Sequence, residues 1–215
     1  MPTKWMWIVA GPNGAGKSSF AGDFLADLGH RNLVKLNADE RTLELRKTFP
    51  DAPQDELNLK AAIEIDAEVA ACIKSRVSFV VETVLSSAKY QDDLLAAKEN
   101  GFNFGFVYVS LHPPELSPRR VSERVKKGGH AVDHDTAVKR HRKSHEQFSW
   151  FAPHADILMV FDNSVKDGDP VLVASRANGK ALKYLRRGRN PSVDAALDTA
   201  FPPKPTISPP RLDRG

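Results

Sequence analysis

Short apolar runs alternate with segments of helical character along most of the chain. Continuous apolar runs predict buried strands, and they occur at 5–10, 33–36, 77–81, 104–111 and 157–161, with a further element at 170–175. Between them, spacing and composition predict helices at about 18–28, 55–75, 87–100, 113–127 and 133–150. Strands that alternate with helices form a parallel sheet covered on both faces. The prediction is therefore an α/β protein, a three-layer α/β/α sandwich with a mainly parallel sheet.

A glycine-rich loop follows the first predicted strand. Residues 11–18 read Gly-Pro-Asn-Gly-Ala-Gly-Lys-Ser and fit the pattern G-x-x-x-x-G-K-[ST] without deviation. In such a loop the backbone N–H groups converge on phosphate oxygens, Lys17 reaches the β- and γ-phosphates, and the Ser18 hydroxyl ligates Mg²⁺. The pattern predicts the fold of the phosphate-loop (P-loop) NTPases and kinases. The candidate ATP-binding residues are Gly11, Asn13, Gly14, Ala15, Gly16, Lys17, Ser18 and Ser19.

Polar side chains follow the second and third predicted strands. Asn37 and Asp39 come after one, and Glu82 and Thr83 end the other. Ligands of open α/β sheets bind outside the carboxyl ends of the strands, so both carboxylates are expected near the γ-phosphate. Asp39 is the better placed to orient an acceptor hydroxyl and take its proton, and Glu82 would hold a Mg²⁺-bound water or a substrate hydroxyl. The alternatives are a helix N-cap for Asp39, with Arg41 at the surface, and a solvated carboxylate for Glu82.

Arginines gather in the two helices predicted between residues 113 and 150. They surround the flexible segment Gly128-Gly129-His130, and they are Arg119, Arg120, Arg124, Arg140 and Arg142. Arginines stabilise the charge on transferred phosphates, and closing lids exclude water from the reaction. We therefore predict a helical lid over about residues 113–150. Without the phosphate loop, the same segment would be interpreted as a solvated helical hairpin.

Two further motifs carry weaker signals. Asn163 lies in Phe161-Asp-Asn-Ser164 at the end of the fifth predicted strand, near where an adenine would lie, although Asp-Asn-Ser is also a common turn. His141 and His145 are one helical turn apart, but no third ligand is evident, so the sequence predicts no zinc site.

Composition and charge narrow the class of protein. Of the 215 residues 41% are hydrophobic and 27% charged, which is typical of a globular protein, and the apolar runs are too short to cross a bilayer. With no secretory signal and a single cysteine, Cys72, the chain is expected to be cytoplasmic, without a membrane partner. The net charge of +4 is compatible with nucleic acid, an acidic protein or a polyanionic small substrate.

The proline content changes near residue 188. Six of the fifteen prolines lie between 191 and 210, where large apolar residues are sparse. This composition predicts a kinase domain over residues 1–187 and a Pro-rich, disordered tail over 188–215. An extended arm that docks on a partner is the alternative.

The ordered set of motifs resembles the zeta toxin family of P-loop kinases, in its short, stand-alone form. The resemblance runs from Trp5 to about Ser175. Beside the loop at 11–18, it rests on Asn37-Ala-Asp-x-x-Arg41, Glu82-Thr83-Val-Leu85, Arg120-Val-x-x-Arg124-Val-x-x-Gly-Gly-His130, Arg140-His-x-Lys-Ser144 and Phe161-Asp-Asn-Ser164. It implies ATP-dependent phosphorylation of a hydroxyl, typically on a UDP-linked amino sugar such as UDP-N-acetylglucosamine. It also implies a protein partner, because family members are often neutralised by an antitoxin.

The resemblance further implies roles for individual residues. Asp39 would be the base, Glu82 and Thr83 would contact the substrate, and Arg124 and Arg140 would bind the ATP phosphates. We group Asn37 and Arg41 with Glu82 and Thr83 as candidate substrate-binding residues. The chain departs from the family at Ser86 and Ser87, where an arginine is usual, at Ala131-Val132-Asp133, where a valine-proline pair is usual, and at Lys143, which replaces an arginine.

The leading hypothesis is a small-molecule or nucleotide-sugar kinase that uses ATP and Mg²⁺. One alternative is a polynucleotide kinase or another small-metabolite kinase, although the chain has no recognisable nucleic-acid-binding module. The other is a nucleotide-dependent switch that hydrolyses ATP slowly without an acceptor.

Overall fold

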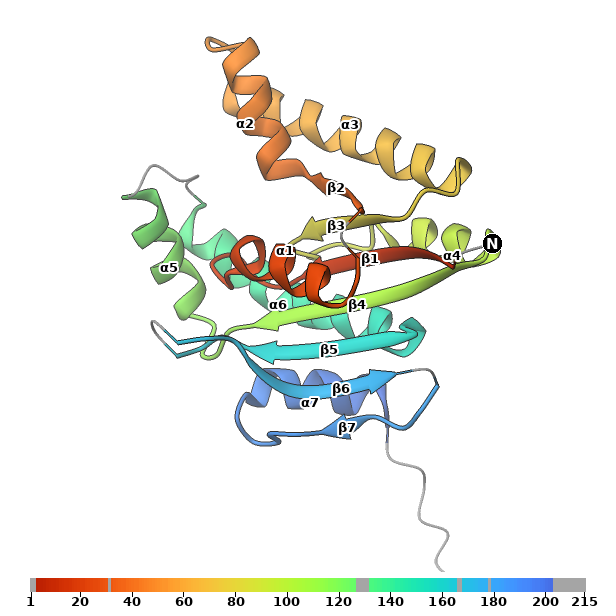
Figure 1. Ribbon diagram of the computed structural model, residues 1–215. Coiled ribbons are helices and arrows are strands. Elements are labelled where there is room, and N and C mark those ends of the chain that lie inside the picture. Colours follow the sequence, from red (N-terminus) through yellow and green to blue (C-terminus); the bar gives the residue numbers. More distant parts are fainter. Residues whose placement is uncertain (1–2, 31, 127–131, 166–167, 178, 203–215) are drawn as a thin grey trace, which may run out of the picture.

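One seven-stranded sheet organises the chain in the computed structural model, which describes residues 3–30, 32–126, 132–165, 168–177 and 179–202 (Figure 1). The strands are β1 (Lys4–Ala10), β2 (Val34–Asn37), β3 (Phe79–Thr83), β4 (Phe102–Ser110), β5 (Ile157–Asp162), β6 (Val171–Ala177) and β7 (Lys183–Tyr184). The helices are α1 (Lys17–Asp27), α2 (Ala38–Thr48), α3 (Gln54–Lys74), α4 (Gln91–Glu99), α5 (Leu116–Val125), α6 (His134–Phe151), the 3₁₀ turn η1 (Ala152–His154) and α7 (Pro191–Ala200).

The strand order is β2-β3-β1-β4-β5-β6-β7, with β1 near the centre. All neighbours from β2 to β5 pair in parallel, and β6 and β7 add antiparallel strands at one edge. Residues 6–10 of β1 are fully buried, as expected of a central parallel strand covered on both faces. The α/β class with a mainly parallel sheet, predicted from the alternation of strands and helices, is confirmed.

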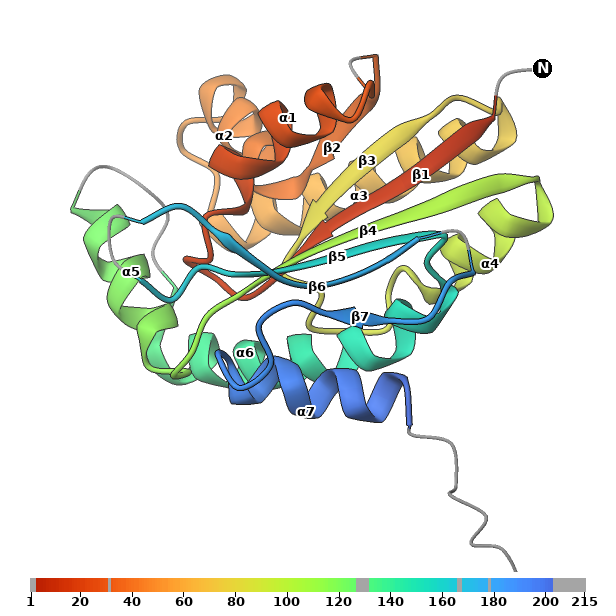
Figure 2. The same cartoon turned by 60° about the horizontal axis from the view of Figure 1, so that its bottom comes forward.

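The two faces of the sheet have separate cores. Side chains from α3, α4, α6 and α7 pack on one face, around Phe104, Phe106 and Phe148. The other core lies under α1 and contains Trp7, Val9 and Leu25 (Figure 2). The site-forming loops therefore leave the carboxyl ends of strands whose positions are fixed from both sides.

Residues 191–200 form a docked helix, so the predicted disordered tail over 188–215 is wrong for this part. The Asn190 side chain accepts a hydrogen bond from Val193 N at 3.2 Å and caps α7, and Pro191 occupies the first turn, where a proline N–H is not needed. Val193 and Leu197 are buried in the core beside α6. The sequence prediction took Pro191 as a sign of disorder, whereas it marks the start of a helix. Residues 203–215 lie outside the described part of the chain.

Helix α6 belongs to the core, so the predicted lid over 113–150 extends too far. Its buried side chains include His141, His145, Phe148 and Phe151, which face the sheet along the length of the helix. Of the described residues, α5 remains a candidate for a lid. The segment Gly128-Gly129-His130, which the sequence predicts to be flexible, lies outside the described residues.

A buried histidine connects α6 to the end of β4. The Nδ1 of His145 lies 2.9 Å from the carbonyl of His141, and its Nε2 lies 2.9 Å from Ser110 Oγ. Because a carbonyl only accepts, Nδ1 carries the proton and Nε2 accepts from the Ser110 hydroxyl. Burial disfavours a second proton and lowers the pKa of His145 to about 4.

Within the described residues, no helix combines the length and the apolar character needed to span a bilayer.

The pKa of His145 predicts acid-sensitive stability. In the unfolded chain a histidine has a pKa near 6.5, whereas the pKa of folded His145 is about 4. As the pH falls between these values, the unfolded state therefore binds a proton that the folded state does not. The stabilisation is complete above about pH 6.5 and is lost toward about pH 4, which corresponds to about 2 kcal/mol between pH 7 and pH 5. In His145→Gln, denaturant unfolding should show a smaller loss of unfolding free energy between pH 7 and pH 5 than in the wild type, by about 2 kcal/mol.

The matched control is His134→Gln, because His134 lies on the same helix with a side chain that is 67% exposed. This variant should keep the pH dependence of the wild type. An identical loss of unfolding free energy in wild type and His145→Gln would contradict the assignment.

Candidate functional site

The phosphate loop between β1 and α1 adopts a conformation that requires glycine at Gly11, where an added Cβ would overlap Val109 O, and at Gly14 and Gly16. Gly14 has φ 76° and Gly16 has φ 82°, in the left-handed region that L side chains rarely adopt. Space is also limiting, since a Cβ on Gly14 would lie 2.9 Å from Arg120 Cβ, and one on Gly16 would lie 2.9 Å from Asn163 Nδ2. Both glycines are therefore needed for the turn and for close contact with neighbouring elements.

Side chains from distant segments hold the loop. Ser117 Oγ of α5 donates to Asn13 O at 2.7 Å, and Asn163 Nδ2, just after β5, donates to Ala15 O at 2.9 Å. The structure thus gives Asn163 a bond to the loop backbone, where the sequence predicted adenine binding. Ser117 was missed because 104 residues separate it from Asn13 and no local pattern marks it.

Lys17 is buried against the loop that it follows. Its Nζ donates to Gly11 O at 3.0 Å and to Pro12 O at 3.2 Å. Burial lowers the pKa of Lys17, the charges of Glu82 and Asp39 oppose this shift, and the charge of Arg124 adds to it. The ammonium therefore lies within the electrostatic field of two carboxylates and one guanidinium.

Ser18 and Glu82 form a hydrogen-bonded pair at the start of α1. Ser18 Oγ donates to Glu82 Oε1 at 2.6 Å, across the neighbouring strands β1 and β3. Burial raises the pKa of Glu82, and the Ser18 bond and the Lys17 charge oppose that shift. Hydroxyl and carboxylate oxygens are the donors that Mg²⁺ prefers, so this pair fits the predicted metal position.

Asp39 stands free at the first turn of α2. Asn37 ends β2 and its Oδ1 accepts from Asp39 N at 2.9 Å and Glu40 N at 3.4 Å, which makes Asn37 the N-cap in place of Asp39. Asp39 is exposed, and its side chain accepts no hydrogen bond from the described residues. The backbone cap leaves the Asp39 carboxylate available for a ligand.

The predicted residues largely converge on one pocket of about 200 Å³ beside the loop. Lys17 lines the pocket from the start of α1, and Arg140 lines it from α6. The lining residues are Lys17, Asn37, Ala38, Asp39, Glu82, Thr83, Val84, Leu85, Ser86, Ser87, Lys89, Tyr90 and Arg140. Donor-side and acceptor-side candidates therefore share a single space.

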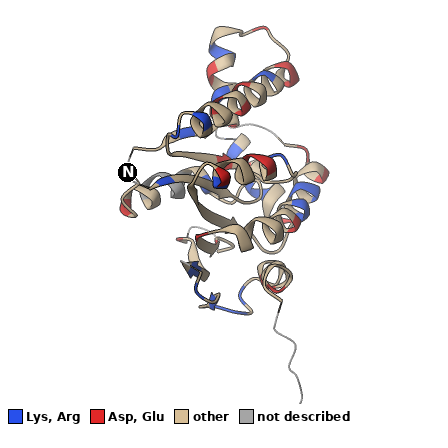
Figure 3. Cartoon of the chain, turned by 90° about the vertical axis from the view of Figure 1, so that its right-hand side faces the viewer, with Lys and Arg blue, Asp and Glu red and all other residues tan. Residues whose placement is uncertain are grey.

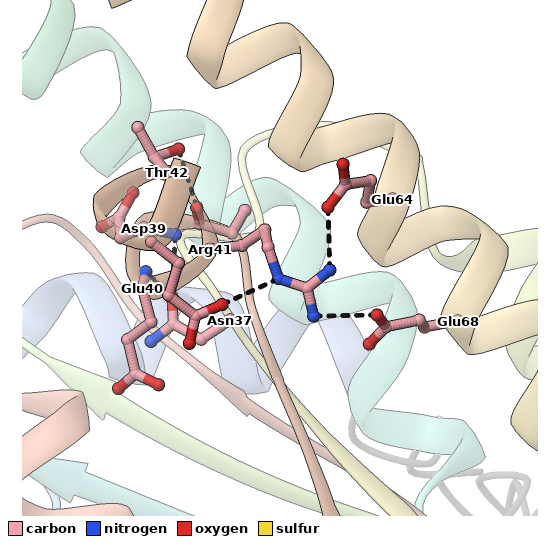
Figure 4. Close-up of polar contacts among 9 residues, drawn as sticks. Asn37, Asp39, Glu40, Arg41, Thr42, Glu64 and Glu68 are labelled. Atoms are coloured by element: carbon pink, nitrogen blue, oxygen red, sulfur yellow. Dashed lines mark hydrogen bonds and ion pairs between the residues drawn. The ribbon is translucent and has the colours of Figure 1, made fainter. Parts of the chain in front are cut away.

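Arg41, by contrast, is engaged in holding two helices together, and substrate binding is not supported for it. Its guanidinium pairs with Glu64 at 2.9 Å and Glu68 at 2.8 Å, both on α3, and with Glu44 at 3.2 Å (Figure 4). The spacing Asn37-Ala-Asp-x-x-Arg41 suggested a substrate-binding arginine close to Asp39. In the structure Arg41 lies on α2 with its side chain directed at α3. These ion pairs raise the pKa of Arg41.

Of the other predicted arginines, Arg140 lines this pocket, whereas Arg142 pairs with Glu146 at 3.8 Å on the same helix. Arg124 and Arg140 are exposed, on α5 and α6, and Arg120 donates to Val165 O at 3.0 Å. Ser19 lies in α1 next to Ser18, but its side chain is not among those described. The first turn of α5 therefore contacts the loop through Ser117. At the other end of α5, Arg124 lies close enough for its charge to lower the pKa of Lys17.

The chain is similar to known proteins in sequence and in fold. The family model described as zeta toxin matches residues 2–176. A protein of Haemophilus influenzae, described as uncharacterized, is 26% identical over 148 residues, which cover 66% of this chain and all of that protein.

Solved structures share the fold. The complex AvrRxo1-ORF1:-ORF2 crystallised with ATP matches with a TM-score of 0.67 and 16% identity over 96% of this chain, which spans 66% of the length of that one. A structure of the PezAT chromosomal toxin-antitoxin system of Streptococcus pneumoniae matches with a TM-score of 0.61 and 14% identity, over 96% of this chain and 82% of that one. At these identities the likeness establishes the fold.

Gly16→Ala should disable the loop through its contact with Asn163. We expect ADP binding, measured by titration calorimetry, to weaken by about 10-fold or more, since the added methyl displaces the amide that bonds Ala15 O. Gly29→Ala is the matched control, because Gly29 also has positive φ (85°) but open space around it. Both variants should unfold at lower temperature, and equal ADP affinities in the two would contradict the proposed contact.

Proposed function

Because this chain belongs to the zeta toxin family, we propose that it is an ATP-dependent kinase that phosphorylates a hydroxyl group of a small molecule. The observation that carries the proposal is the convergence of Lys17, Glu82, Asp39 and Arg140 on one pocket beside the phosphate loop. A phosphotransferase needs a cradle for the donor phosphates, positive charge for the transition state and a base for the acceptor. These residues are suited to all three tasks.

On the donor side, the loop N–H groups and Lys17 would bind the phosphates of ATP. Lys17 would exchange its bonds to Gly11 O and Pro12 O for phosphate oxygens, so that its buried charge stays paired. Ser18 and Glu82 would hold Mg²⁺, which when bound neutralises charge on the phosphates. Arg140 would contact the transferring group from α6, and Arg124 would close on it as α5 moves.

On the acceptor side, Asp39 would orient the hydroxyl and accept its proton. An exposed carboxylate that the Asn37 cap leaves unengaged can take up this role without disturbing the start of α2. Glu82 and Thr83 would contact the remainder of the acceptor. Asp39 and Lys17 line the same pocket, in which a phosphate would pass from donor to acceptor.

For the acceptor, we propose a UDP-linked amino sugar such as UDP-N-acetylglucosamine, on the strength of family membership. This chain departs from the family at Ser86 and Ser87, which line the pocket at a place where an arginine is usual. A polynucleotide is less favoured, because the chain has no recognisable nucleic-acid-binding module. On the side shown in Figure 3, at which β1 begins, basic segments are interspersed with acidic ones.

We also propose an antitoxin protein as a partner. The support is membership of the zeta toxin family and the likeness in fold to a chain from a toxin-antitoxin system. Co-expression with a neighbouring small open reading frame, followed by co-purification, tests this partner directly.

An acceptor screen tests the proposed reaction. The purified chain is incubated with γ-labelled ATP, Mg²⁺ and separate pools of UDP-sugars, nucleosides, small metabolites and 5′-hydroxyl oligonucleotides, and products are searched by mass spectrometry for one added phosphate. We expect a product in the UDP-sugar pool. Slow ATP hydrolysis that no pool accelerates would contradict the kinase and favour a nucleotide-dependent switch.

Asp39→Asn should separate chemistry from binding. We expect kcat to fall by about 10²–10⁴-fold, because the amide cannot accept the proton, while ADP affinity changes little. Lys17→Ala should instead weaken nucleotide binding strongly, since it removes the buried charge that would pair with the β- and γ-phosphates. Both are measured by steady-state kinetics and calorimetry with the accepted substrate.

Glu40→Gln is the control for Asp39→Asn, because it removes the neighbouring charge from the same exposed turn. It should leave kcat within a few-fold of wild type. Wild-type turnover in Asp39→Asn would refute the role of Asp39 as base.

A further inference from the structure

A buried carboxylate at the end of β5 is held by the segment that precedes α7. Asp162 is only 2% exposed, and its Oδ2 accepts from Arg189 Nε at 2.8 Å while its Oδ1 accepts from Asn190 Nδ2 at 2.9 Å. A buried charge needs such partners to remain in place, and removal of one partner leaves it uncompensated. Arg189 and Asn190 therefore determine the conformation at residue 162.

The segment is itself anchored at several points. Asn190 is 1% exposed, and its amide also donates to Ser110 Oγ at 3.2 Å, while its Oδ1 caps α7. Gly188 N donates to Asp194 Oδ2 at 2.7 Å within the same turn. The clamp on Asp162 thus belongs to a rigid helix start packed beside α6 (Figure 2).

The residue next to Asp162 reaches the phosphate loop. Asn163 N donates to Ser110 O at 2.9 Å, which fixes its backbone at the end of β4, and its side chain donates to Ala15 O. Ser164 Oγ donates to Asp162 Oδ1 and accepts from His112 N at 2.8 Å. Residues 162–164 therefore form one hydrogen-bonded turn, with Arg189 and Asn190 on one side and the loop on the other.

We propose that Arg189 and Asn190 are positioning residues for the nucleotide site. Through Asp162 they hold the turn that aims the Asn163 amide at Ala15 O, and thereby they keep the loop N–H groups directed at the donor phosphates. Both residues lie beyond residues 2–176, the part of the chain that the family model matches. The inference rests on the nucleotide-binding part of the proposed function.

The test is a double-mutant cycle on the full-length chain, with ADP affinity measured by calorimetry. Arg189→Met should weaken ADP binding about 10-fold in the wild-type background, through loss of one charge-assisted bond and release of the turn. In an Asn163→Ala background the same change should weaken binding by less than about twofold, because the connection to the loop is already absent. Arg189→Lys, which can still donate to Asp162, should recover most of the affinity.

Arg187→Met is the matched control, because Arg187 lies in the same segment but pairs with the exposed Asp198 at 2.6 Å. It should leave ADP affinity unchanged. Thermal unfolding, followed in parallel, distinguishes loss of fold from loss of affinity. If Arg189→Met does not fold, the cycle is run with Arg189→Gln, whose amide retains a donor.

These measurements distinguish failure of the positioning role of Arg189 and Asn190 from failure of the proposed nucleotide binding. Equal ADP affinity in wild type and a folded Arg189 variant, or an additive cycle with Asn163→Ala, would overturn the positioning role and leave the kinase proposal intact. Absence of ADP binding in the wild-type chain would overturn both.

Discussion

The phosphate loop is held in shape because neighbouring elements bond two of its carbonyl oxygens. Ser117 bonds the carbonyl of Asn13 and Asn163 that of Ala15, while Lys17 bonds those of Gly11 and Pro12 and would release them to bind a phosphate. Buried peptide groups without partners would cost stability and let the loop turn. The shape of the donor site therefore depends on α5 and on the end of β5 as much as on the loop sequence, and the left-handed glycines make these close approaches feasible.

Charge is distributed unevenly around this loop. Lys17 and Glu82 are both desolvated, and each shifts the other's pKa toward its charged form, against the effect of burial. Asp39 stays in solvent on a helix that Asn37 caps and that Arg41 ties to α3. The pocket is thus buried at Lys17 and open to solvent at Asp39, as the kinase that we propose would need in order to admit and release its acceptor.

The domain extends further toward the C-terminus than the sequence predicted, because α7 packs in its core. Asn190 and Pro191 start α7, whose apolar side chains complete the core beside α6, and Arg189 neutralises the buried Asp162 on the way. The same few residues therefore serve packing and the geometry of the phosphate turn. This coupling links stability at one edge of the sheet to the site at its carboxyl end.

The sequence by itself determined the features that depend on neighbouring residues. The alternation of strands and helices gave the sheet, the unbroken pattern at 11–18 gave the phosphate loop, and the ends of β2 and β3 identified Asp39 and Glu82 as pocket residues. Tertiary structure alone decided that Arg41 pairs with α3 and that Asn163 and Ser117 bond the loop. These contacts join residues 23 to 148 positions apart, whose proximity arises from packing of the whole sheet, and no local pattern of residue types records it. The start of α7 at Asn190 and Pro191 is a local signal, but its docking beside α6 again depends on tertiary packing.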